Sequence, residues 1–199
     1  MPGWPPRCEL TVFPATSLPR SITQPDPSVV QALTRDGVPK AWFYAGYAAS
    51  REPRAVDVAP LGRLIRFASS GLGASLLVEP VLGEVLFLVT VRGAVPLFVN
   101  SSLAQFTATA RAVVDEYPYY SLTSSADEVV AASAQVAAII EAIDPPALGS
   151  ELYWSTFVAD MRAGAFPSEV LARTELAGAA RFRSGRGWFR HIAATRIGA

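Results

Sequence analysis

The hydrophobic pattern of this 199-residue chain changes its period at Asn100, and that change limits the possible folds more than any other feature. Before Asn100, short apolar runs are separated by turns that contain glycine, which is typical of antiparallel strands. After Asn100, apolar residues recur every three or four positions, as on an amphipathic helix. Strands followed by helices predict a single α+β domain in which an antiparallel β-meander sheet packs against helices.

Several short segments before Asn100 have the composition of regular elements. Asp26-Pro27 offers a helix cap and Gly37 a helix stop, so a short helix is predicted over Ser28–Arg35. A short strand is possible at Leu10–Phe13. The strands predicted for the meander are Trp42–Tyr47, Leu64–Ala68, Ser75–Val78, Glu84–Val91 and Pro96–Val99.

The first helix after the meander is predicted over residues 102–117. Asn100 ends the last strand and is interpreted as a capping residue. The spacing Ser102-x-x-Gln105 lets a hydroxyl and a carboxamide bond backbone N–H groups reciprocally at the start of the helix. On this interpretation Asn100→Ala costs about 1 kcal/mol of stability through the loss of a cap.

Two further helices follow in the second half of the chain. Ser125-x-x-Glu128 is a second capping box, and Asp144-Pro145 is expected to cap a short turn, again at about 1 kcal/mol if removed. The last long helix is predicted from Ser150 to about Ala163, with Trp154 on its buried face.

The length of the chain suits one domain, because a domain of this size buries roughly 70% of its unfolded surface without a disulfide or a metal. Residues 1–16 hold four prolines and predict a poorly ordered lead-in. Residues 17–178 are assigned to the α+β domain, including a short helix that begins at Pro167. Residues 179–199 are assigned to an Arg-rich tail that is mobile or loosely docked.

Charge is balanced overall but unevenly distributed. The chain has seventeen basic and seventeen acidic residues, and this balance gives no indication of a nucleic-acid or anionic membrane partner. Residues 112–175 hold ten acidic and two basic side chains, whereas residues 176–199 hold five arginines and no acid. Arg also interleaves with aromatics over residues 181–190, so nucleic acid is unlikely as a partner except through the tail, for which a terminal extension is the alternative.

The acidic middle contains the candidate partner-binding residues. Two of them lie at the C-terminal end of a predicted helix, where the helix dipole disfavours acids. They therefore form an acidic binding face or, alternatively, an ordinary solvated surface. The candidates are Asp115, Glu116, Asp127, Glu128 and Glu141.

The sequence offers little for catalysis. His191 and Cys8 are the only residues of their types, so no catalytic triad or zinc cluster can be assembled, and Gly71-Leu-Gly73 lacks the pattern of a phosphate loop. The one catalytic arrangement that the sequence does not exclude is a general acid/base pair of two carboxylates from different helices. We expect no catalytic residue, cofactor, metal or small-molecule substrate.

The chain is expected to remain in the cytoplasm. Its start lacks the basic flank and apolar run of a secretory signal, and charged residues interrupt its apolar segments before they reach the ~20 residues that span a bilayer. A single cysteine suits a reducing compartment. Sixteen of the seventeen basic residues are Arg, which suggests a bacterium with a GC-rich genome.

Six short motifs occur in an order that resembles one family. They are Leu18-Pro19, Gly37-Val38-Pro39, Pro80-Val81-Leu82-Gly83, Phe98–Ser102, Ile143-Asp144-Pro145 and Tyr153-Trp154. This ordered set resembles the fourth subfamily of the SUKH superfamily of bacterial immunity proteins. The similarity spans about residues 17–164 and does not include the Arg-rich tail.

The resemblance implies a non-enzymatic immunity protein that binds and neutralises a cognate polymorphic toxin. Such toxins are often nucleases or nucleic-acid deaminases, and the immunity protein blocks the active site. The alternative is a protein-binding or scaffold module of the same fold in a regulatory complex. The motif residues expected to have structural roles are Asn100, Ser101, Ser102, Asp144, Pro145, Tyr153 and Trp154.

Overall fold

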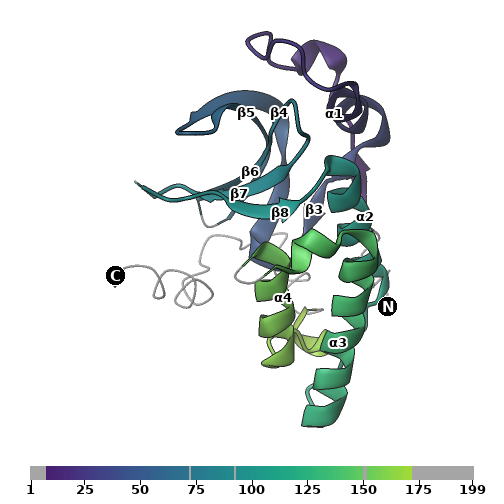
Figure 1. The fold of residues 1–199 in the computed structure, drawn as a ribbon. Coiled ribbons are helices and arrows are strands. Elements are labelled where there is room, and N and C mark those ends of the chain that lie inside the picture. Colours follow the sequence, from purple (N-terminus) through teal and green to yellow (C-terminus); the bar gives the residue numbers. More distant parts are fainter. Residues whose placement is uncertain (1–7, 72, 92, 150–151, 172–199) are drawn as a thin grey trace.

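A computed structural model describes residues 8–71, 73–91, 93–149 and 152–171 of the chain. Six antiparallel strands follow one another in sequence order and form a curled sheet, with the long helices gathered on one side of it (Figure 1). This arrangement confirms the predicted α+β class. The strands of the sheet are β3 (Ala41–Trp42), β4 (Tyr47–Val58), β5 (Gly62–Ser70), β6 (Ala74–Val78), β7 (Val85–Val89) and β8 (Leu97–Asn100).

The strand predicted at Trp42–Tyr47 is wrong for most of its length. Only β3 pairs there, and a 3-10 turn, η3 (Tyr44–Gly46), leads into β4. β4 is the longest strand, yet its polar centre around Pro53 resembles a loop in the sequence. The pairing of β4 with β5 shifts register between Ala49 and Arg54, so Pro53 interrupts no regular ladder hydrogen bond.

The N-terminal segment contributes to the fold from its first described residues. β1 (Leu10–Thr11) pairs with β2 (Val38–Pro39), and the short turn η1 (Ala15–Ser17) follows. Phe13 is buried in the main core. Residues 8–16 are thus part of the domain rather than a lead-in to it.

The first helix has the ends that the sequence predicts. The Oδ1 atom of Asp26 accepts a 2.8 Å hydrogen bond from the backbone N of Ser28. The helix starts as α1 (Pro27–Gln31) and widens into a π-helical turn, η2 (Ala32–Asp36). Gly37 follows with φ of 84°, a value that favours glycine.

Three long helices follow the sheet, close to their predicted bounds. They are α2 (Leu103–Asp115), α3 (Ala126–Ile143) and α4 (Tyr153–Arg162), and the 3-10 turn η4 (Pro145–Leu148) connects the last two. Residues 168–171 form the additional helical turn predicted at Pro167. Residues beyond 171, and with them the predicted tail, lie outside the described part of the chain.

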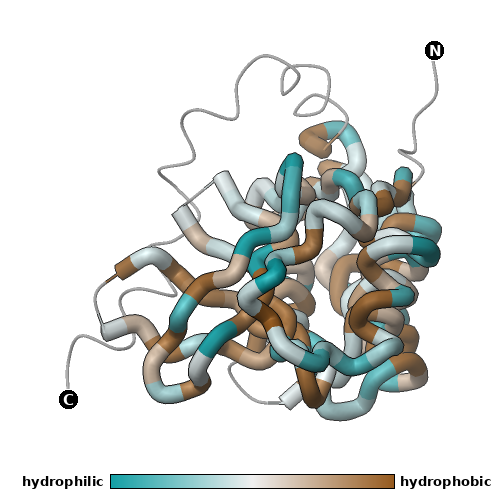
Figure 2. Tube along the Cα trace, turned by 90° about the horizontal axis from the view of Figure 1, so that it is seen from above, coloured by the Kyte–Doolittle hydropathy of each residue, from teal (hydrophilic) through white to brown (hydrophobic). Residues whose placement is uncertain are grey.

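The main core lies between the helices and one face of the sheet. Figure 2 shows hydrophobic residues along both the sheet and the helices. Successive residues of a strand point to opposite faces of the sheet, and the face turned towards the helices is apolar. Core side chains from the strands include Phe67, Leu76, Phe87 and Val99, and those from the helices include Phe106, Val113, Ile140, Trp154 and Phe157. Across the described residues, no helix is both long enough and apolar enough to cross a bilayer.

Candidate functional site

A buried carboxylate, that of Asp144, joins the end of the sheet to the end of α3. Its Oδ2 atom accepts hydrogen bonds from Asn100 Nδ2 and from the backbone N of Ser101, both at 2.8 Å. Its Oδ1 atom accepts a third, at 2.7 Å, from the hydroxyl of Ser101. Asp144 is fully buried, and these three donors replace the water that its charge would otherwise bind.

The amide of Asn100 extends this network to α4. Its Oδ1 atom accepts a 2.8 Å hydrogen bond from Trp154 Nε1. Its Nδ2 atom donates to Asp144 and lies 3.4 Å from the hydroxyl of Thr109. Asn100, Thr109 and Trp154 are all fully buried. One side chain at the end of β8 therefore fixes the positions of α2, α3 and α4.

Aromatic residues continue the network towards the edge of the sheet. Trp42 Nε1 donates a 3.2 Å hydrogen bond to the hydroxyl of Tyr153, and the rings of Trp42 and Trp154 are 5.2 Å apart. Burial raises the pKa of Tyr153, so its hydroxyl remains protonated. The motif residues at 100, 101, 144, 153 and 154, distant in sequence, thus meet at one buried junction, which we call the polar junction.

Three capping predictions are wrong at or beside this junction. Asn100 does not cap α2, because Ser102 does so by accepting a 3.2 Å hydrogen bond from the backbone N of Gln105. Gln105 does not complete a reciprocal box, since its side chain contacts the Ser102 hydroxyl and the carbonyl of Ile143. Asp144 makes no side-chain cap to η4, which begins at the exposed Pro145.

The partners of Asn100 and Asp144 explain this difference. The two side chains lie 44 residues apart in the sequence, and local spacing gives no signal for such a contact. A buried three-way contact between Asn, Asp and Trp also satisfies more polar atoms than a cap would. Apart from the half-buried Ser101, the side chains of the polar junction are buried, and the junction serves as a scaffold.

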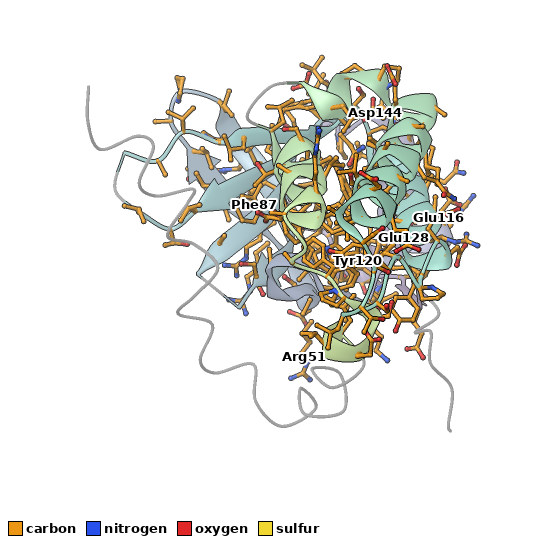
Figure 3. All side chains as sticks on the ribbon, turned by 90° about the horizontal axis from the view of Figure 1, so that it is seen from below. Arg51, Phe87, Glu116, Tyr120, Glu128 and Asp144 are labelled. Carbon is orange, nitrogen blue, oxygen red and sulfur yellow. The ribbon has the colours of Figure 1, made fainter. Side chains whose placement is uncertain are left out.

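The acidic candidates lie on the helices, and the structure brings some of them together. Asp115 is the last residue of α2, and Glu116 accepts a 2.6 Å hydrogen bond from Gln135 of α3. Glu128 is two helical turns before Gln135 and so lies on the same side of α3. Figure 3 shows Glu116 and Glu128 on the same side of the helical layer.

Glu128 and Asp127 have a structural explanation as well. The carboxylate of Glu128 accepts from the backbone N of Ser125 at 2.6 Å, and Ser125 Oγ accepts from the backbone N of Glu128. The hydrogen bonds that the carboxylate accepts from the backbone N and the hydroxyl of Ser125 lower the pKa of Glu128, and the reciprocal pair confirms the predicted capping box. Asp127 lies in the same first turn, where the helix dipole favours an acid.

Glu141 does not belong with the other acids. It is exposed on α3 but lies thirteen residues beyond Glu128, roughly 20 Å along the helix. We therefore define the acidic helical surface as Asp115, Glu116, Asp127 and Glu128.

An exposed leucine that the sequence analysis missed lies in the loop between α2 and α3. Leu122 is 59% exposed, and its backbone N donates a 3.0 Å hydrogen bond to Glu169. Tyr120 holds this loop in place, because its hydroxyl donates to the carbonyl of Met161 and accepts from the backbone N of Phe166. Nothing in the local sequence distinguishes Leu122 from a core leucine.

Groups capable of nucleophilic or metal chemistry are sparse in the described part of the chain. No three His, Cys, Asp or Glu side chains of those residues are grouped as a metal site requires. Cys8 is half-buried, and burial raises the pKa of its thiol to about 11, which disfavours the reactive thiolate. Asp160 accepts a hydrogen bond from the hydroxyl of Tyr44 at 3.3 Å.

Comparison with known proteins gives one result that bears on identity. The chain matches the SUKH-4 immunity protein family over residues 7–160, a range that includes the whole polar junction. Searches of curated proteins and of solved structures found no match. The family match covers more than half of the chain, and the fold and the motif positions agree with it. The chain therefore belongs to the SUKH-4 immunity protein family.

Proposed function

We propose that this protein binds a cognate polymorphic toxin in the bacterial cytoplasm and neutralises it by occluding its active site, with no catalysis of its own. Membership of the immunity protein family over residues 7–160 carries the proposal. The buried side chains of Asn100, Asp144 and Trp154 support the absence of catalysis, because their hydrogen bonds have an architectural role.

We further propose that the toxin is a nuclease or a nucleic-acid deaminase and that the acidic helical surface meets it. Enzymes that act on nucleic acids carry positive charge around the substrate path, and an acidic surface speeds encounter with such a protein. Arg111 is the only basic residue within α2 and α3, so little positive charge opposes the effect.

Leu122 gives this surface an apolar contact. It projects from the loop that joins α2 to α3, beside the start of α3 where Asp127 and Glu128 lie. Interfaces usually combine a desolvated apolar centre with a polar rim. The hydrogen bonds of Tyr120 hold the loop before binding, which reduces the entropy lost on association.

Co-expression tests the proposal directly. The toxin domain encoded beside this gene is expressed in a heterologous host, alone and together with the protein. Survival only in the presence of the protein, and co-elution of the two in size-exclusion chromatography, are expected. A toxin that kills equally in both cases would contradict the proposal, and stable association with an unrelated complex would favour a scaffold role.

A further inference from the structure

The face of the sheet turned away from the helices carries a continuous row of side chains from β4 to β8. Each member is the direct cross-strand partner of the next, and such partners share one face of a sheet. The members, which we call the arginine row, are Arg54, Arg66, Leu77, Leu86 and Phe98. No described helix packs on this row.

The apolar part of this face is already organised in the isolated chain. Leu64 and Leu77 are fully buried, and Val58 and Leu86 almost so, in a cluster whose members all come from the strands. These side chains pack against one another on the curled sheet, whose strands are drawn in Figure 1. Leu88 and Phe98 remain half-buried at one side of the cluster, which leaves apolar surface for a partner.

The two arginines are unfavourable for the free protein. Arg54 and Arg66 face each other on neighbouring strands, and like charges in that position destabilise a sheet. The Nε atom of Arg66 is buried and has no hydrogen-bond partner. A buried donor without an acceptor costs stability, so folding alone does not explain this residue.

No carboxylate of the described residues pairs with either guanidinium. The ion pairs among those residues join Lys40 to Glu9 and Arg63 to Asp57. Glu79, near the end of β6, accepts hydrogen bonds from the backbone N–H groups of Val81 and Leu82. Among the described residues, therefore, no group accepts from the Nε atom of Arg66, and neither Arg54 nor Arg66 forms an ion pair.

We propose that the arginine row binds a segment of the cognate toxin that places a carboxylate between Arg54 and Arg66 and apolar side chains on Phe98 and the neighbouring Leu88. This inference rests on the proposed function and names a second contact surface for it. Arg54 is exposed and Arg66 is half-buried, and a carboxylate that accepts hydrogen bonds from both guanidinium groups would offset their mutual repulsion.

The chemistry of the row also excludes other occupants. The Arg-rich sequence at residues 181–190 has the wrong charge to neutralise two arginines. A free inorganic anion would use the arginines but leave the apolar side chains uncovered. A protein segment with an acidic residue and neighbouring apolar residues uses both.

Two variants and one control test this site. Arg66→Met keeps the apolar stem but removes the guanidinium, and Arg54→Gln removes an exposed charge without disturbing packing. Arg51→Gln is the control, since Arg51 is an exposed arginine of the same strand that lies outside the row (Figure 3). Calorimetric titration with the purified toxin domain gives the Kd of each protein, and thermal melting gives its stability.

Each row variant should raise the Kd about tenfold or more, as expected for the loss of a charge-assisted hydrogen bond. Arg66→Met should melt at or above the wild-type temperature, because it removes a buried donor without a partner. Arg51→Gln should change neither quantity.

Wild-type affinity in both row variants would overturn the inference, and so would an equal loss of affinity in Arg51→Gln. If Arg66→Met fails to fold, Arg54→Gln decides the question alone. A wild-type protein that does not bind the active toxin contradicts the proposed function itself, a result seen before any variant is measured.

Discussion

Asp144 contributes more to the stability of the fold than a helix cap would. Asp144→Ala removes the acceptor of one hydrogen bond from the buried Asn100 amide and of two from the half-buried Ser101. We expect a loss of about 3 kcal/mol or more in the free energy of unfolding, instead of the ~1 kcal/mol of a cap. Asp144→Asn keeps one acceptor oxygen and should lose less.

Urea denaturation measures both values, with Asp127→Ala as an exposed control on α3. A loss of only ~1 kcal/mol in Asp144→Ala would reduce the polar junction to local capping.

Cys8 should react slowly with alkylating reagents. Burial raises the pKa of its thiol to about 11, well above the ordinary value of a cysteine, so the reactive thiolate is scarce at pH 8. We expect iodoacetamide to modify the folded protein roughly a hundredfold more slowly than the protein in urea, as followed by mass spectrometry. Equal rates in both conditions would mean that Cys8 is solvated.

At the scale of elements, α2 and α3 carry the charge proposed to steer the toxin. The double variant Asp115→Lys/Asp127→Lys reverses two exposed acids of the acidic helical surface. We expect it to lower the association rate with the toxin about tenfold at low salt and to flatten the salt dependence. Stopped-flow fluorescence measures the rate.

Asp36→Lys/Glu141→Lys is the matched control, because it makes the same charge change at exposed positions away from that surface. If the control slows association as much as the test variant does, net charge rather than the acidic helical surface determines the rate.

The elements differed in how far the sequence could predict them. α3 begins where Ser125 and Glu128 indicate, since a capping box is a contact between residues three positions apart. β4 was not predicted, because Arg51, Glu52 and Pro53 interrupt the apolar pattern and only pairing with β5 makes that segment a strand. Local contacts can be read from local spacing, and long-range pairing cannot.

The same distinction applies to the candidate site. The motif residues were expected to be structural, but their meeting at one carboxylate depends on contacts across 43 to 54 positions. The exposure of Leu122 and the missing partner of Arg66 depend on the surrounding three-dimensional packing. Neither feature can be predicted from composition or from hydrophobic periodicity.

For the whole molecule, buried tyrosines should set the alkaline limit of stability. Burial raises the pKa values of Tyr44, Tyr47, Tyr119 and Tyr153 in the folded protein. A folded pKa above the unfolded value of about 10 contributes stability that is complete below pH 10 and is lost as the pH rises further. The protein should therefore unfold as its tyrosines ionise.

Absorbance at 295 nm and circular dichroism, recorded along one pH titration, test this coupling. Both signals should change together above pH 10. Ionisation of these tyrosines near pH 10 in a protein that still has its folded spectrum would contradict the burial described for them.

All side chains of the polar junction except the half-buried Ser101 are buried, and neither proposed contact surface includes any of them. The residues of the polar junction are thus separate from those that would decide which toxin the protein recognises. Exposed side chains can be substituted one by one without disturbing the buried residues, so the binding specificity of the protein can change in evolution while its fold is kept. In the laboratory, the same separation makes the chain a suitable recipient for grafted contact residues from a sister immunity protein.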